Sequence, residues 1–180
     1  MQTIKWGGGL WVGLHCMTYH YPLELKPTQS DKDNYKNFFE SLKYMLPCIY
    51  CRQSYTTYLK YLPIDDYLDD RHGVTYWLFS IHNLVNQKLS KTMIDFSECC
   101  VIYEKMRAKC GKLIENDVKY QECVKNVEKI NCNDVKQFVH DAEKKYKNST
   151  NEKIIKLLQS PENPNKECNV CKYKVSYDKY

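Results

Sequence analysis

Two cysteines separated by two residues, Cys48 and Cys51, follow Pro47 at the start of a predicted helix. Thiols at this spacing can close into a small disulfide, and a helix N-terminus with the nearby Arg52 favours the thiolate by lowering its pKa. The pair therefore indicates a redox-active dithiol, with a structural disulfide and half of a zinc site as alternatives. Zinc needs two more ligands, and the pair Cys168-x-x-Cys171 lies over a hundred residues away, whereas zinc ribbons space their pairs by roughly 15–20 residues.

Polar residues interrupt the apolar stripe of another predicted helix at residues 82–91. His82 and Asn86 share one face of this helix, and Lys88 and Lys91 follow one turn later. Burying such groups without partners is costly. They predict either a hydrogen-bond network between helices or a bound aromatic cofactor that carries phosphate.

A third pattern lies near the N-terminus, where Trp11, His15 and Tyr19 recur every four residues on one helical face. Taken alone, this pattern is more often a core stripe with a satisfied histidine than a binding face. Beside a cofactor site, the same aromatic rings would stack on the cofactor.

Helical periodicity runs through the whole chain and identifies the elements that position these residues. The predicted helices of the first part cover residues 9–22, 34–46, 48–62, 74–91 and 96–109, and those of the second part cover 113–130, 133–147 and 151–159. No segment shows the alternation of a strand. The sequence therefore predicts an all-α protein.

Composition divides the chain into two parts. Residues 1–103 carry 18 of the 24 aromatic residues and no net charge, while residues 104–180 carry the whole net charge of +5. With 27% charged and 43% hydrophobic residues, the chain is not disordered as a whole. It has no arginine-rich run and no apolar run near the ~20 residues that a membrane span needs, so we expect no nucleic-acid binding and no membrane insertion.

The ten cysteines create a tension, because residues 1–9 show no apolar segment of a secretion signal. Thiols that stay reduced, metal binding, or a chain that itself makes disulfides would each resolve it. Of the cysteines outside the two pairs, we expect Cys16 to be a small buried residue. We expect Cys99 and Cys100 to have different partners, and Cys110, Cys123 and Cys132 to staple the second part of the chain.

Taken together and in order, these motifs resemble the Erv/ALR family of FAD-dependent sulfhydryl oxidases. The resemblance covers residues 6–103 and is closest to the short forms of large cytoplasmic DNA viruses. It is carried by Trp6-Gly7-x-x-x-Trp11-x-x-Leu14-His15, Tyr21-Pro22, Pro47-Cys48-x-x-Cys51, Trp77 and His82-Asn83-x-Val85-Asn86-x-Lys88-Leu89-x-Lys91.

The resemblance implies a four-helix bundle with a short fifth helix that binds FAD, usually as a homodimer. We accordingly divide the chain into an Erv/ALR-like FAD-binding domain at 1–108, a helical cysteine-containing extension at 109–160 and a mobile tail with Cys-x-x-Cys at 161–180. Many relatives have a structural disulfide where this chain has Phe79 and Phe96. We expect an apolar contact between these two rings instead.

The resemblance also implies residue roles. Cys51 would be the charge-transfer thiolate beside the flavin, Cys48 the interchange thiol, and Cys168–Cys171 the shuttle disulfide, delivered from the other subunit. The residues expected to bind FAD are Gly7, Gly8, Trp11, His15, Tyr19, Phe79, His82, Asn83, Asn86, Lys88, Lys91 and Tyr103.

The implied activity is thiol oxidation that forms disulfides in protein substrates and passes electrons through Cys-x-x-Cys and FAD to dioxygen, giving hydrogen peroxide. The expected partners are protein thiols, such as a thioredoxin-like carrier or virion proteins, and no metal is expected. The expected location is the host cytoplasm, at a viral factory, or the virion. The alternative is a zinc-binding, Lys-rich interaction module without catalytic activity.

Overall fold

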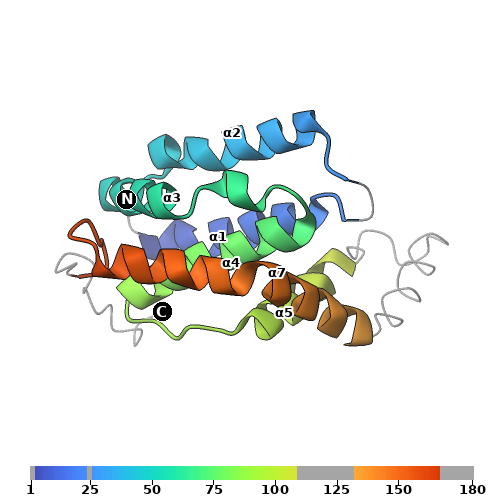
Figure 1. The fold of residues 1–180 in the computed structure, drawn as a ribbon. Coiled ribbons are helices and arrows are strands. Elements are labelled where there is room, and N and C mark those ends of the chain that lie inside the picture. Colours follow the sequence, from blue (N-terminus) through green and yellow to red (C-terminus); the bar gives the residue numbers. More distant parts are fainter. Residues whose placement is uncertain (1–2, 24–25, 109–131, 167–180) are drawn as a thin grey trace.

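The computed structural model describes residues 3–23, 26–108 and 132–166, and these residues form helices without any β-strand (Figure 1). The first four helices are α1 (Thr3–His20), α2 (Gln29–Met45), α3 (Ile49–Tyr61) and α4 (Arg71–Lys88). A short 3-10 helix, η1 (Ile64–Tyr67), joins α3 to α4, and α5 (Phe96–Ala108) and α7 (Cys132–Gln159) follow. The prediction of an all-α protein is confirmed.

The first helices begin earlier than predicted. The α1 helix starts at Thr3 rather than residue 9, because the glycines at 7–9 lie within the helix and do not precede it. The α2 helix starts at Gln29, where Thr28 and Asp31 form a capping box. The Asp31 N–H donates to Thr28 Oγ1 at 3.1 Å, and the Thr28 N–H donates to Asp31 Oδ2 at 2.9 Å.

The α4 helix lies at the centre of the molecule and packs against α1, α5 and α7. Its Trp77 is fully buried, donates from Nε1 to the Leu62 carbonyl at 2.9 Å, and meets the ring of Phe39 edge-on at 5.1 Å. Aromatic rings thus hold α2 and the end of α3 against α4.

The predicted contact between Phe79 and Phe96 is also confirmed. Their ring centroids lie 5.1 Å apart, and Tyr76 packs edge-on against Phe96 at 4.8 Å. These rings join α4 to the start of α5 without a disulfide.

The α7 helix is continuous from Cys132 to Gln159, whereas the sequence predicted two helices with a break at 148–150. Its buried side chains Phe138, Ala142, Tyr146 and Leu157 face the bundle. At the supposed break, buried Thr150 shares a 2.9 Å hydrogen bond with Tyr67 Oη. Figure 1 shows α7 lying along α4, so this part of the extension belongs to the same packed body.

The rest of the predicted extension lies largely outside the described residues, including the predicted helix 113–130. Residues 160–166, at the start of the predicted tail, form turns after α7. Within the described chain, Cys16, Cys99 and Cys100 are thiols. Cys99 and Cys100 are buried, but Cys16 is exposed, so the prediction that Cys16 is buried is wrong. No described helix has the length and apolar character of a membrane span.

Candidate active site

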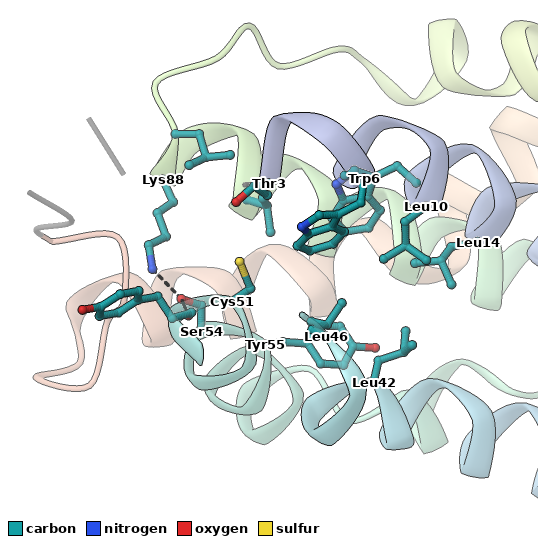
Figure 2. A pocket seen from close by; sticks show the side chains of 15 residues that line it. Thr3, Trp6, Leu10, Leu14, Leu42, Leu46, Cys51, Ser54, Tyr55 and Lys88 are labelled. Atoms are coloured by element: carbon teal, nitrogen blue, oxygen red, sulfur yellow. Dashed lines mark hydrogen bonds between the residues drawn. The ribbon is translucent and has the colours of Figure 1, made fainter. Parts of the chain in front are cut away.

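A pocket of about 730 Å³, partly open to solvent, lies where the start of α1 meets the end of α2, the start of α3 and the end of α4 (Figure 2). The side chains that line it are mostly apolar. They are Thr3, Trp6, Gly7, Leu10, Trp11, Leu14, Leu42, Leu46, Tyr50, Cys51, Ser54, Tyr55, Val85, Lys88 and Leu89.

Cys51 of the predicted redox pair lies in the wall of this pocket. In Figure 2 its sulfur points into the space between the Trp6 ring and Lys88. Cys48 is the N-cap residue of α3, is partly buried and is not among the lining residues. The two thiols therefore differ in position: Cys51 lines the pocket, and Cys48 does not.

The position of Cys48 at a helix N-terminus perturbs its acidity. Burial raises the pKa of its thiol, but hydrogen bonds from the Cys51 side chain and from the backbone N–H groups of Cys51 and Tyr50 lower it further than burial raises it. The net effect is a lowered pKa, as expected for a thiol at the free N–H groups of a helix. Arg52, which was expected to contribute, directs its guanidinium to the Tyr44 carbonyl at 3.3 Å.

Lys88 supplies a positive charge at the edge of the pocket. Its ammonium group donates a hydrogen bond to Ser54 Oγ, which crosses from α4 to α3 beside Cys51. Lys91 is exposed just beyond the end of α4, and its backbone N–H donates to the Asn86 carbonyl at 2.9 Å. These two lysines can neutralise an anionic group at this end of the bundle.

A cluster of planar rings continues from the pocket into the interior. Trp11 stacks on His82 with ring centroids 4.1 Å apart and planes within 9°, and His15 stacks on Tyr103 at 4.3 Å. His15 Nε2 and His82 Nδ1 lie 3.1 Å apart and share a hydrogen bond. Tyr19 contacts Tyr103 at 5.9 Å, which completes the cluster.

Burial makes both histidines weak bases. It lowers the pKa of His15 to about 3, with a further contribution from the charge of His82. It lowers the pKa of His82 to about 4, with a further contribution from Lys91. At neutral pH both rings are therefore uncharged, and each keeps a nitrogen that can accept or donate a hydrogen bond.

The buried polar atoms that have no hydrogen-bond partner among the described residues include Trp6 Nε1 at the pocket and His15 Nδ1 in the ring cluster. Buried polar groups normally have partners. An apolar pocket with unpaired ring nitrogens and lysines at its edge fits a flat aromatic cofactor that carries phosphate.

The remaining predicted residues lie close by but in different environments. Gly7 is buried and lines the pocket, while Gly8 is exposed. Asn83 donates from Nδ2 to the Ile94 carbonyl at 2.9 Å, and Asn86 is partly buried. Phe79 contacts Phe96 and is not a lining residue. Cys168 and Cys171 lie outside the described residues.

Sequence reasoning missed part of the pocket wall. Trp6 and Leu10 belong to it, as do Ser54 and Tyr55 of α3. The spacing of Trp6, Leu10 and Leu14 every four residues carried the signal, but the predicted helix began only at residue 9. Among the described residues, no three His, Cys, Asp or Glu side chains are grouped to hold a metal ion.

Comparisons with known proteins agree with this geometry. Residues 8–109 match the Erv1/Alr family. A probable FAD-linked sulfhydryl oxidase of Acanthamoeba polyphaga mimivirus is 36% identical over 106 residues, which cover 58% of this chain and 73% of that protein. An FAD-linked sulfhydryl oxidase of African swine fever virus (isolate Tick/Malawi/Lil 20-1/1983) is 35% identical over 107 residues, which cover 56% of this chain and 82% of that protein. The mitochondrial FAD-linked sulfhydryl oxidase of Saccharomyces cerevisiae is 28% identical over 99 residues, which cover 55% of this chain and 48% of that protein. The chain belongs to the Erv1/Alr family.

Proposed function

We propose that this protein is an FAD-linked thiol oxidase that forms disulfide bonds in protein substrates. The observation that carries the proposal is Cys51 in the wall of an apolar pocket, with its partner Cys48 at the start of the same helix and outside that wall. This arrangement lets one thiol face a cofactor while the other meets a substrate. The family and its named relatives support the same activity.

FAD is the cofactor that fits this site. Trp6 and Trp11 would hold the aromatic ring systems, Lys88 and Lys91 would neutralise the diphosphate, and the unpaired nitrogens of Trp6 and His15 would gain partners. When bound, FAD would supply the two-electron chemistry: it would take up the electron pair released as Cys48 and Cys51 re-form their disulfide, and dioxygen would receive that pair with two protons to give hydrogen peroxide.

The two cysteines divide the thiol chemistry between them. A substrate thiolate attacks Cys48 Sγ of the Cys48–Cys51 disulfide, and Cys51 leaves as a thiolate facing the pocket. A second substrate thiol then attacks the mixed disulfide and releases Cys48. The lowered pKa of Cys48 makes it a good leaving group in this second step.

The other proposals come from the family resemblance. Cys168 and Cys171 would form a shuttle disulfide between protein substrates and Cys48, and the enzyme would act as a homodimer. Its substrates would be a thioredoxin-like carrier or virion proteins. Its place of action would be the host cytoplasm, at a viral factory, or the virion, in line with its viral relatives.

The experiment that tests the activity is a flavin spectrum combined with oxygen consumption. Purified protein should show a flavin absorption band and consume oxygen with a small dithiol. Cys51→Ser should abolish turnover with every thiol but keep the flavin, whereas Cys16→Ser, an exposed cysteine away from the pocket, should leave turnover unchanged. Colourless protein with stoichiometric zinc would overturn the proposal.

A further inference from the structure

The segment that follows α7 is fastened to the redox end of the bundle. Asn165 accepts a hydrogen bond from Tyr58 Oη at 2.6 Å and donates from Nδ2 to the Leu84 carbonyl at 3.1 Å and to Gln87 Oε1 at 3.0 Å. One side chain thus joins the segment to both α3 and α4. An amide that satisfies three partners on two helices fixes its own position.

Three further contacts support this attachment. Lys60 pairs with Glu162 at 2.6 Å, and Tyr61 Oη donates to Ser160 Oγ at 2.7 Å. The Asn163 side chain donates to the Leu158 carbonyl at 2.8 Å, closing the turn on the end of α7. The path of the chain is therefore defined up to the point where the described residues end, at Lys166.

This attachment lies close to the active site of the same chain. Gln87, a partner of Asn165, precedes Lys88 at the edge of the pocket. Tyr58 follows Cys51 by seven residues and the target Cys48 by ten, which corresponds to about 10 Å and about 15 Å along the helix axis. Figure 1 shows the end of α7 at the same end of the molecule as the start of α3 and the end of α4.

Exposed apolar side chains flank Cys48 in the sequence, where α2 ends and α3 begins. Tyr44 and Met45 precede it and are 72% and 70% exposed, and Ile49 and Tyr50 follow it and are 51% and 45% exposed. We call these four residues the thiol patch. A patch of this character next to a reactive thiol indicates a surface that a polypeptide covers.

The chain itself offers a segment that can reach the thiol patch. Cys168 is three residues and Cys171 six residues beyond Asn165, and extended chain spans about 10 Å and 20 Å over those lengths. Residues 170–180 include Val170, Tyr173, Val175, Tyr177 and Tyr180, which are apolar or aromatic like the patch. The length, the starting point and the composition of residues 167–180 therefore all suit this segment to cover the thiol patch.

We infer that residues 167–180 dock on the thiol patch of their own chain and deliver Cys168–Cys171 to Cys48 in cis, with Asn165 as the positioning residue. The inference rests on the proposed function and replaces delivery from the other subunit. A tail fastened this close to its target has a high effective concentration there, so no second subunit is needed.

The exchange balances as follows. After a substrate has reduced the tail disulfide, one tail thiolate attacks Cys48 Sγ and expels Cys51 as a thiolate. The second tail thiolate then attacks the tail sulfur of the mixed disulfide and expels Cys48. The tail leaves as a disulfide, Cys48 and Cys51 are left reduced, and the two protons of the tail dithiol pass to the Cys48–Cys51 pair or to water.

Two trapping variants test the route. The first variant is Cys51→Ala/Cys171→Ala and the second is Cys51→Ala/Cys168→Ala, so each keeps Cys48 and one tail thiol. Diamide can oxidise these two thiols to a disulfide, and diamide itself is reduced to its hydrazine. Peptide mapping after non-reducing electrophoresis shows whether that disulfide lies within one chain. We expect an intrachain bond to Cys48 in at least one variant, with a yield that does not change on dilution.

A disulfide between Cys48 and the tail cysteine that is found only between the two chains of a covalent dimer would overturn delivery in cis. Failure of both variants to form it, in protein that still has the helical circular dichroism of wild type, would show that the thiol patch serves a substrate or a second copy instead. Activity with a small dithiol separates the two proposals. If wild type oxidises a dithiol but the trapping variants form the bond only between chains, only the inference is refuted. If wild type does not oxidise a dithiol, the proposed function is refuted.

The positioning role of Asn165 has its own test. In Asn165→Ala/Asn163→Ala/Glu162→Gln the last fastened residue becomes Ser160, so the tether to Cys168 grows from three to eight residues. Effective concentration falls with roughly the −3/2 power of length, which predicts about a fourfold slower trapping rate. Asn151→Ala, an exposed asparagine on α7, is the matched control and should trap at the unchanged rate. Equal rates in all three proteins would refute the role of Asn165.

Discussion

The paired histidines His15 and His82 should make the flavin-free protein sensitive to mild acid. Burial holds their pKa values at about 3 and about 4, against the ordinary value of 6.5. In the unfolded chain both rings take up a proton as the pH falls through 6.5. In the folded chain they stay neutral until the pH is much lower, so acid favours the unfolded state.

The size of the effect follows from His15, which is completely buried. Between pH 7 and pH 5 the unfolded ring goes from mostly neutral to nearly fully protonated, while the folded ring stays neutral. Linkage then predicts a loss of about 2 kcal/mol of unfolding free energy from this residue alone. His82 is less buried and adds a smaller loss, as does His72, whose pKa is lowered by burial and partly restored by Asp70.

Urea denaturation at pH 7 and pH 5, with a reductant to keep the cysteines as thiols, measures the loss. His15→Leu removes the titrating ring, so the difference in unfolding free energy between the two pH values should shrink by about 2 kcal/mol, whatever the variant's stability at pH 7. His20→Gln, at the exposed end of α1, is the control and should show the wild-type difference. If His15→Leu loses as much unfolding free energy between pH 7 and pH 5 as wild type does, the histidine pair is not the cause of the acid sensitivity.

Three further outcomes are expected. Gly73→Ala would place a methyl group 2.8 Å from the Tyr146 ring and against the Tyr67 carbonyl, so thermal denaturation should show a loss of about 2 kcal/mol or more. For Phe79→Ala and Phe96→Ala, a double-mutant cycle in urea should give a coupling of about 0.5–1.5 kcal/mol, and additive losses would contradict the proposed ring contact. Lys88→Met should weaken FAD binding about tenfold, because a charge-assisted contact contributes about 1.5–3 kcal/mol, and fluorescence titration of flavin-free protein would measure it.

The sequence predicted best those features in which residue type and spacing both point to one chemistry. The Cys48 and Cys51 pair lies at a helix start, as its spacing indicated, and Cys51 and Lys88 line the pocket, whereas Cys48 does not. A contact between Phe79 and Phe96 was predicted because these two residues replace both cysteines of a structural disulfide that many relatives have. The structure brings the two rings into contact.

Features decided by distant contacts could not be predicted in the same way. The first helix was predicted to begin at residue 9, yet it begins at Thr3, and Trp6 and Leu10 line the pocket on either side of Gly7. Residues 148–150 of α7 read as a loop, because serine, threonine and asparagine compete with helical hydrogen bonds. The partner that keeps Thr150 helical is Tyr67, which is 83 residues away in the sequence.

The extension contributes to the active site through α4, although it contains none of the described pocket residues. Phe138 of α7 stacks on His72 at 4.3 Å, and Lys145 pairs with Asp70 at 2.7 Å at the start of α4. At the other end of α7, Asn165 bonds to the Leu84 carbonyl and Gln87. Because α4 is held by α7 near both ends, the Lys88 side of the pocket has little freedom to move relative to α3. The described part of the extension therefore stabilises the α4 side of the site.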